Sequence, residues 1–466
     1  MNNSTLELLG EAARKAGAGT AGIEGAAADG AAASGTAREV YYAETRELSM
    51  SACKGAIDSF TDSRSGAAAV RVVEEKRMGA AFTERIDGES LAKAAEAARS
   101  AATFMDTDEG NALYEGGEGQ RVGLDSAWSN DSVATPVKKE LALATEKRCY
   151  ALDRRIVNVP TVGYGEFDSV RAIANARGML KAERHRVCYL YAYVIATDGD
   201  STETGSYGEE ASGFAGLDHE RVAAKAVEDA IEKLHATEPP SGTYRAVIKN
   251  DAASSLLGAF MGSVSAEAIQ KGKSRLAGKR GQKVGSMLFT VIDDPGLSPL
   301  RHAAFDDEGV PAGRLEIFRE GVFVEPLYTL YSARREGARP NGRGRRGGTA
   351  SNVSAGLFNA FVPAGRDNLD ALLSGIGTGI LITDVQGLHA GLNPVSGDFS
   401  CSARGFAVEA GKKAGALRNF TVSGNFYDLI AGIEATGSDL RDDLSDAFRS
   451  PSLAIAALSV SGSDKD

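Results

Sequence analysis

Residues Gly375–Gly424 read GIGTGILITDVQGLHAGLNPVSGDFSCSARGFAVEAGKKAGALRNFTVSG. Apolar runs alternate there with glycine-bearing turns, a pattern typical of tightly turned β-structure. The runs occupy residues 379–385, 405–410 and 418–423. Glycine permits a positive φ or the close approach of another backbone, and both uses are expected here at Gly387, Gly391, Gly397 and Gly405. The stretch predicts a strand-rich C-terminal region that can build a site.

The bulk composition narrows the class of protein. A chain of 466 residues predicts two or three domains with real cores. The formal net charge of −11 disfavours a dedicated nucleic-acid binder, which needs clustered Lys and Arg. The cysteines are far apart and form no CxxC pair, which favours reduced thiols: Cys53, Cys149, Cys188 and Cys401. With no basic leader and no long apolar run, the sequence predicts a cytoplasmic protein without a membrane segment.

Turn-rich and Gly-rich stretches suggest three domains. A polar linker at 110–123 and the Pro-Pro-Ser-Gly at 239–242 divide the chain into an N-terminal α/β domain, a middle α/β domain and a C-terminal β-rich domain. The predicted bounds are 1–112, 113–238 and 239–466. Because mixed elements come first and strands predominate late, we expect an α+β fold rather than a doubly wound parallel sheet.

Local patterns place the main elements. β-branched and aromatic runs predict strands at 39–49, 67–75, 78–83, 161–170, 187–196 and 244–249. Helical spacing and strong helix formers predict helices at 90–104, 137–150, 218–234 and 251–264. The Ala/Gly-rich stretch 11–35 is expected to end a short helix and continue as a flexible connection.

His219 and Glu220 are the first residues that suggest a zinc helix. Such a helix needs a second histidine about one turn away, and the chain continues Arg221-Val222-Ala223 instead. A helix capped by Asp218 explains the pair better. The other histidines are isolated in sequence: His185, His235, His302 and His389.

Several longer motifs resemble the TldD/PmbA family, once called modulators of DNA gyrase and now understood as metallopeptidase components. The resembling passages are SGTYRAVIKNDAASSLLGAFMGS (241–263), FDDEGVPAGRLEIFREGVFVEPLYTLYSARREG (305–337), SGDFSCSARGFAVEAGK (396–412), SGNFYDLIAGIEATGSDL (423–440) and SPSLAIAALSVSG (450–462). They cover most of the region after Pro240. The resemblance implies a TldD/PmbA-like fold, and within the family it points to the PmbA (TldE) type.

The resemblance also implies where zinc ligands would stand. In the TldD-type subunit the helix of the first passage carries HExxxH, and a cysteine near the C-terminus completes the site. Here Gly258 and Ser263 stand at the histidine positions and Ala259 at the glutamate, and no cysteine follows Cys401. Since zinc requires N, O or S side-chain donors, we expect no zinc or other cofactor in this chain.

The predicted function follows from the resemblance. It implies a PmbA/TldE-like subunit, a pseudoenzyme in a TldD/TldE-type metallopeptidase heterodimer that acts in proteolysis and peptide maturation. The zinc is expected on a TldD-like partner, and the substrate is a peptide. Alone, this chain could form a homodimer.

Other residues keep alternatives open. Cys401, if His389 lies nearby, or Asp398 would serve a stand-alone hydrolase. A structural turn is the preferred role of Asp398, and the acidic run Asp306-Asp307-Glu308 is read as a solvated turn rather than a carboxylate site. A third possibility is a non-enzymatic protein that binds a peptide or partner.

An arginine-rich segment follows the acidic run. Its arginines are Arg334, Arg335, Arg339, Arg343, Arg345 and Arg346. The segment lacks interleaved aromatics, so an exposed loop that contacts a partner or a substrate peptide is favoured over nucleic-acid binding.

Overall fold

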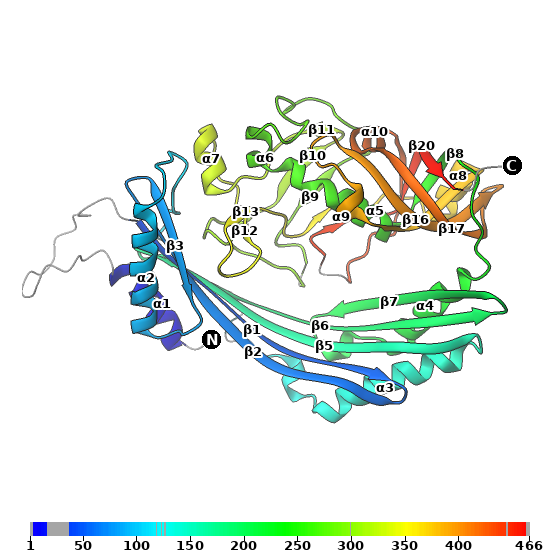
Figure 1. Ribbon diagram of the computed structural model, residues 1–466, viewed down its shortest axis with the longest axis horizontal. Helices are drawn as coiled ribbons and strands as arrows, with labels where there is room; N and C mark the ends of the chain where they lie inside the picture. Colours follow the sequence, from blue (N-terminus) through cyan, green and yellow to red (C-terminus); the bar gives the residue numbers. More distant parts are fainter. Residues whose placement is uncertain are drawn as a thin grey trace, which may run out of the picture.

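The computed structural model describes residues 3–15, 37–117, 119–122, 124, 127–298, 300–443 and 446–462. Its N-terminal half is built on one long, curved sheet that runs beneath the C-terminal half (Figure 1). The strand order is β3-β2-β1-β5-β6-β4, and β7 also pairs with β6. The strands are β1 (Ala37–Cys53), β2 (Ala56–Glu74), β3 (Arg77–Thr83), β4 (Gln120–Val122), β5 (Ile156–Asn175), β6 (Leu180–Asp198) and β7 (Ser201–Ala211).

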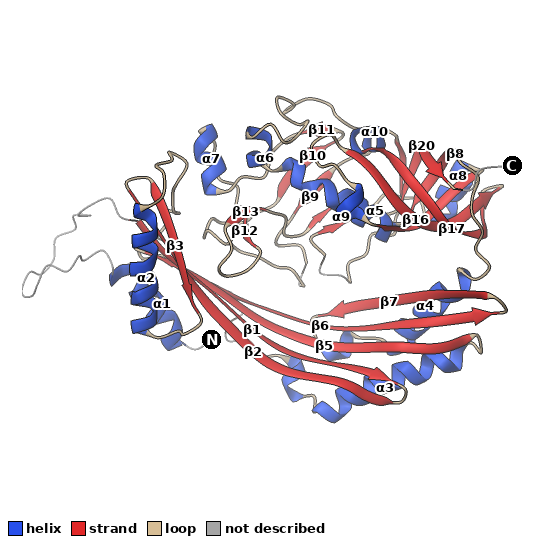
Figure 2. Cartoon of the chain, in the orientation of Figure 1, coloured by secondary structure: helices blue, strands red, loops and turns tan. Residues whose placement is uncertain are grey.

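Helices cover the convex face of this sheet at both ends (Figure 2). They are α1 (Asn3–Lys15) and α2 (Gly88–Thr103) at one end, and α3 (Thr135–Leu152) and α4 (His219–Glu232) at the other; the short 3-10 turns are Ser129–Ser132 and Phe214–Gly216. Side chains alternate between the two faces of a strand. Leu190, Ala192 and Val194 of β6 are fully buried in one cluster with the apolar face of α4, so they point to the helix layer. The intervening β6 side chains therefore face the C-terminal half.

The C-terminal half contains a closed barrel. Its strands follow the order β17-β16-β15-β8-β20, and β17 pairs with β20 to close the ring, while β18 extends from β20. These strands are β8 (Gly242–Ile248), β15 (Gly379–Gln386), β16 (Asp398–Glu409), β17 (Lys412–Asn425), β18 (Ile433–Thr436) and β20 (Leu453–Ser461). The last strand thus joins the first across the full length of this half.

A smaller sheet and short helices lie beside the barrel. The sheet has the order β11-β10-β9-β14-β19, and β12 pairs with β13. Its strands are β9 (Val291–Asp293), β10 (Leu315–Arg319), β11 (Val322–Phe323), β14 (Ala360–Phe361) and β19 (Phe448–Arg449), with β12 (Gly344–Arg346) and β13 (Val353–Ala355) separate. The helices are α5 (Asn250–Phe260), α6 (Ala266–Gln270), α7 (Leu330–Glu336), α8 (Leu369–Ile376), α9 (Leu388–Gly391) and α10 (Phe426–Ala431), and a 3-10 turn spans Met261–Val264.

The main core lies between α5 and the barrel. Leu256, Leu257 and Phe260 of α5 are buried with the inward side chains of the barrel strands. The ring of Phe260 stacks on that of Phe426 at 4.7 Å between centroids. Because α5 is anchored by these large side chains, its opposite, small-residue face is left toward the N-terminal half.

The glycine-rich stretch behaves as predicted. Gly387 and Gly397 adopt positive φ values of 75° and 85°. A Cβ on Gly405 would lie 1.9 Å from the carbonyl oxygen of Leu381, and one on Gly391 would lie 2.1 Å from that of Ser400. The stretch forms most of strands β15, β16 and β17 of the barrel. The predicted α+β fold with a strand-rich C-terminal region is confirmed.

The stretches expected to form separate first and middle domains share one sheet, since β1 pairs with β5 from Glu39 to Ala52. The predicted linker at 110–123 includes strand β4, which pairs with β6. The flexible connection predicted within 11–35 lies outside the described residues from residue 16 onward.

Among the described helices, none is long and apolar enough to cross a membrane.

Candidate functional site

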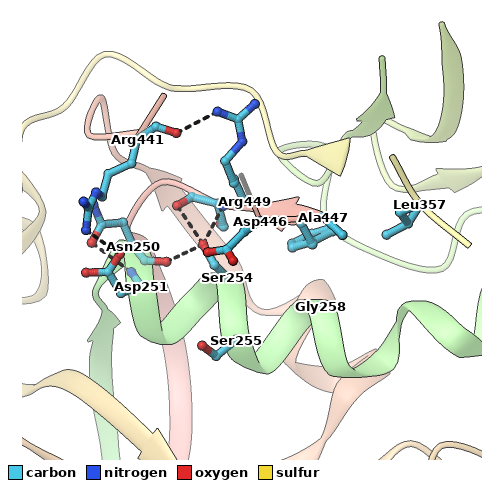
Figure 3. Close-up of a pocket in the computed structure, with 12 residues that line it drawn as sticks. Asn250, Asp251, Ser254, Ser255, Gly258, Leu357, Arg441, Asp446, Ala447 and Arg449 are labelled. Carbon is cyan, nitrogen blue, oxygen red and sulfur yellow. Dashed lines mark hydrogen bonds and ion pairs between the residues drawn. The ribbon is translucent and has the colours of Figure 1, made fainter. Parts of the chain in front are cut away.

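A cavity of about 370 Å³ lies over the small-residue face of α5 (Figure 3). The helix contributes Asn250, Asp251, Ser254, Ser255 and Gly258; the other walls are Leu357, Arg441 and residues 446–450. The backbone N–H of Ser450 donates to the Ser254 Oγ at 2.8 Å, which ties the C-terminal segment to the helix. The cavity therefore lies where helix α5 meets the C-terminal segment. These are the two parts of the chain that, by the resemblance described above, correspond to the zinc-ligand segments of a TldD-type subunit.

The residues at the expected zinc positions do not fit a metal. Gly258 has no side chain, and a Cβ added there would lie 3.3 Å from the Phe448 Cβ, so Phe448 occupies the space beside it. Ala259 is exposed and carries no donor. The buried Ser263 hydroxyl donates to the Phe260 carbonyl at 2.7 Å. Across the described ranges no group of three or more His, Cys, Asp or Glu could hold a metal ion.

A second cavity of about 400 Å³ adjoins the first. It lies between β6, β7 and the C-terminal half, and it shares Asp251 and Arg441 with the α5 cavity. Arg441 Nη2 donates to the Gly208 carbonyl on β7 at 3.0 Å, and Arg441 Nη1 lies 3.5 Å from the Asp251 carboxylate. Arg441 thus joins the two halves at the point where the cavities meet.

Asp398 holds a turn. Its carboxylate accepts hydrogen bonds from the Ser396 Oγ at 2.7 Å and the Asn425 Nδ2 at 2.8 Å. These bonds, that of Ser396 first, lower the pKa of Asp398. Both of these donors to the carboxylate are thus neighbouring side chains rather than the backbone of the turn. Such a low pKa suits a structural anion better than a general base.

Cys401 is built into the barrel core. It is 2% exposed, and its Sγ lies 4.0 Å from the Gly391 carbonyl oxygen. Burial raises the pKa of this thiol, whereas a nucleophilic cysteine needs a lowered one. His389 lies exposed on the short helix α9. The geometry therefore opposes activation of Cys401.

The acidic run was wrongly predicted to be a solvated turn. Asp306, Asp307 and Glu308 are 1%, 2% and 2% exposed. The Asp306 carboxylate accepts bonds from the backbone N–H groups of Glu308, Val310 and Gly344 at 2.8–2.9 Å. The run is buried because arginines distant in sequence converge on it, a partnership that local turn chemistry cannot reveal.

Two of those arginines come from the long sheet of the N-terminal half. Arg171 of β5 binds Asp307 with one end of its guanidinium, and its Nε lies 2.6 Å from Glu183. Arg71 of β2 lies 3.5 Å from Glu308 and 2.9 Å from Glu39. The concave face of the long sheet is thereby joined to the C-terminal half through a buried ion network.

The arginine-rich segment was expected to be an exposed loop, but half of its arginines are buried or half-buried, and Arg334 and Arg335 lie on helix α7. Arg343 is fully buried and pairs with Asp293 at 2.6 Å. The Arg346 side chain is 3% exposed and lies 3.0 Å from Glu39, and Arg345 is half-buried beside Asp307. The remaining members are exposed: Arg334, Arg335 and Arg339. Only these three can reach a partner from the surface.

The ion network should respond to acid. Burial alone would raise the pKa of Glu183, but Arg171 and His185 outweigh it and lower the pKa from 4.5 to about 2. Because the folded pKa is depressed, the stabilisation is present above the unfolded pKa and is lost as pH falls. The difference in unfolding free energy between the wild type and Glu183→Gln should shrink by about 2 kcal/mol from pH 5 to pH 3.

Urea unfolding of the wild type and Glu183→Gln at several pH values measures this difference in unfolding free energy. The comparison with Glu183→Gln cancels the titration of all other groups, because the variant removes only the titration of residue 183. A difference that stays constant with pH would show that Glu183 is not held ionised by Arg171.

Sequence reasoning missed several residues around the cavities. Arg441 and Phe448 belong to a stretch without a recognised motif, so nothing in the sequence indicated their contact with α5. The aromatic run of β6 predicts a strand but does not by itself indicate a binding surface. Tyr189, Tyr191 and Tyr193 stand at every second position of this run. In a strand this alternation predicts that one face carries the aromatic side chains.

Three family models match successive parts of the chain. Models of the PmbA/TldA metallopeptidase domain 1, central domain and C-terminal domain match residues 39–102, 128–234 and 241–462. The metalloprotease PmbA of Escherichia coli O157:H7 is 25% identical over 303 residues, which is 65% of either chain. A metalloprotease TldD homolog of Haemophilus influenzae is 25% identical over 327 residues, or 67% of either chain.

Solved structures resemble the whole molecule. A putative modulator of DNA gyrase from Thermotoga maritima superposes with a TM-score of 0.82 at 30% identity, over 91% of this chain and 96% of that one. TldE from Thermococcus kodakarensis superposes with a TM-score of 0.81 at 22% identity, over 91% and 97%. The second likeness concerns the fold alone.

Proposed function

Because the chain belongs to the TldD/PmbA metallopeptidase family, we propose that it is the PmbA/TldE-type subunit of a two-chain peptidase. In this proposal the catalytic zinc and its glutamate base belong to a TldD-like partner, and this chain has lost its own zinc motif. The names of its relatives as metalloproteases support a proteolytic role. The complex acts on peptides in the cytoplasm.

One observation carries the proposal. The α5 cavity retains the helix and the C-terminal segment, yet Gly258 and Ala259 offer no donor and Phe448 packs against Gly258. A hydrolytic zinc needs three protein ligands and a bound water, and a base must activate that water. The framework is present while the chemical groups are replaced together, as expected of a subunit whose partner performs the reaction.

This chain would shape the path of the substrate. The two adjoining cavities, together about as large as a few amino-acid residues, connect the concave face of the long sheet with α5 through Arg441. Peptide recognition in such a site relies on walls that exclude water and orient the chain. The exposed Arg334, Arg335 and Arg339 are candidate contacts for the partner, and without a partner the chain would pair with itself.

The test is co-purification with the HExxxH-bearing paralogue from the same genome. Metal content by mass spectrometry and cleavage of an unstructured peptide are measured for each chain and for the pair. We expect zinc only in the paralogue, and cleavage by the pair that chelation abolishes. Stoichiometric zinc in this chain alone, or cleavage by it alone, would contradict the proposal.

Variants separate the proposal from a stand-alone hydrolase. Cys401→Ala and Asp398→Asn should leave cleavage by the pair unchanged, because neither group is placed for catalysis. Replacing the glutamate of the paralogue's zinc motif with glutamine should abolish cleavage while the pair still forms. Loss of activity on Cys401→Ala in a folded protein would favour the hydrolase.

A further inference from the structure

Three aromatic rings lie side by side on the concave face of the long sheet. The ring centroids of Phe167 and Tyr189 are 5.9 Å apart, and those of Tyr189 and Tyr191 are 6.1 Å apart. Adjacent rings are inclined by only about 25°. Phe167, Tyr189 and Tyr191 are named here the aromatic platform.

Glycines on the neighbouring strand allow the platform to form. Tyr191 is in register with Gly163 of β5, and Tyr189 with Gly165. A Cβ on Gly163 would lie 2.1 Å from the Tyr191 ring, and one on Gly165 would lie 2.4 Å from the Tyr189 ring. The tyrosines therefore lean across β5 over bare backbone, where Tyr191 is exposed and Tyr189 is half-buried.

The platform borders the candidate site. Tyr189 and Tyr191 line the second cavity, which shares Asp251 and Arg441 with the α5 cavity. The alternate residues of β6 are buried against α3 and α4, so the rings face the C-terminal half. The Tyr191 side chain is 38% exposed, so its ring is accessible to a ligand in the cavity.

We infer that the aromatic platform binds the aromatic side chains of extended peptide substrates as they approach α5. Open aromatic surfaces attract other rings through stacked or edge contacts. A cavity of about 400 Å³ admits a short peptide segment and excludes a folded domain. The inference rests on the proposed role in peptide handling and adds a preference for aromatic residues in the substrate.

The test measures peptide binding to the full chain without any partner. The probes are two short, dye-labelled Gly/Ser peptides that differ only in one central residue, Phe or Ala, and binding is followed by fluorescence anisotropy. We expect the Phe peptide to bind about three- to tenfold more tightly, the effect of one added ring contact. This preference should disappear in Tyr191→Ala.

Further variants separate the platform from a general effect on folding. Gly165→Val keeps every ring but displaces that of Tyr189, so it should also reduce the preference. Tyr191→Phe should retain it, and so should Phe60→Ala, which removes an exposed ring beside Lys139 of α3 on the other face of the sheet. Circular dichroism and thermal unfolding establish that each variant is folded.

Three results would overturn the inference: equal binding of the two peptides, no binding of either, or a preference that survives both Tyr191→Ala and Gly165→Val. Because no partner, metal or cleavage enters this measurement, failure of the proposed function in the co-purification experiment remains a separate outcome.

Discussion

Arg171→Met is expected to lower the free energy of unfolding by about 3 to 5 kcal/mol. Arg171 lies between Glu183 and Asp307, which are 0% and 2% exposed, and the variant would leave both carboxylates without their main counter-charge. Methionine retains much of the volume, so the loss reports on charge rather than on a void. Urea unfolding at neutral pH measures the change.

Arg335→Met is the matched control. Its guanidinium is exposed and lies 3.3 Å from Asp108, an arrangement that contributes at most about 1 kcal/mol. If the two variants lose similar amounts of stability, the buried network does not hold the two halves together as described.

Gly405→Ala should destabilise the barrel by about 3 kcal/mol. The added methyl group would lie 1.9 Å from the Leu381 carbonyl oxygen and 2.9 Å from its carbon, so strands β15 and β16 would have to separate. Backbone cannot swing aside as a flexible side chain can. Thermal unfolding measures the loss.

Gly415→Ala tests the same change on the next strand. A Cβ on Gly415 meets nothing within 4 Å, so stability should change by less than about 1 kcal/mol. Equal effects of the two substitutions would mean that general backbone entropy, rather than close strand approach at Gly405, determines the outcome.

Strand and helix positions were predictable where apolar residues carried the pattern. The strand predicted at 187–196 is the apolar part of β6, which begins earlier, at Leu180. The missed part contains Lys181 and Glu183, which are buried because they bind the Gly309 carbonyl and Arg171. Charged residues in a strand look like a loop until their partners are known.

The candidate site was predictable only in outline. Positions 258, 259 and 263 could be assigned from the resemblance, and the structure adds that Phe448 packs against Gly258. The acidic run and Arg346 were misread as exposed because their partners Glu39, Arg71 and Arg171 lie far away in sequence. Long-range ion pairing leaves no periodic signal in a single sequence.

The closed barrel sets the order in which the chain can fold during synthesis. Strand β8 pairs with β20, so the ring cannot close until residues 453–461 have left the ribosome. The long sheet uses only residues 37–211 and can form well before. If the long sheet forms first, its concave face would present Glu39, Arg71 and Arg171 to water until the second half docks, and these charges would disfavour aggregation.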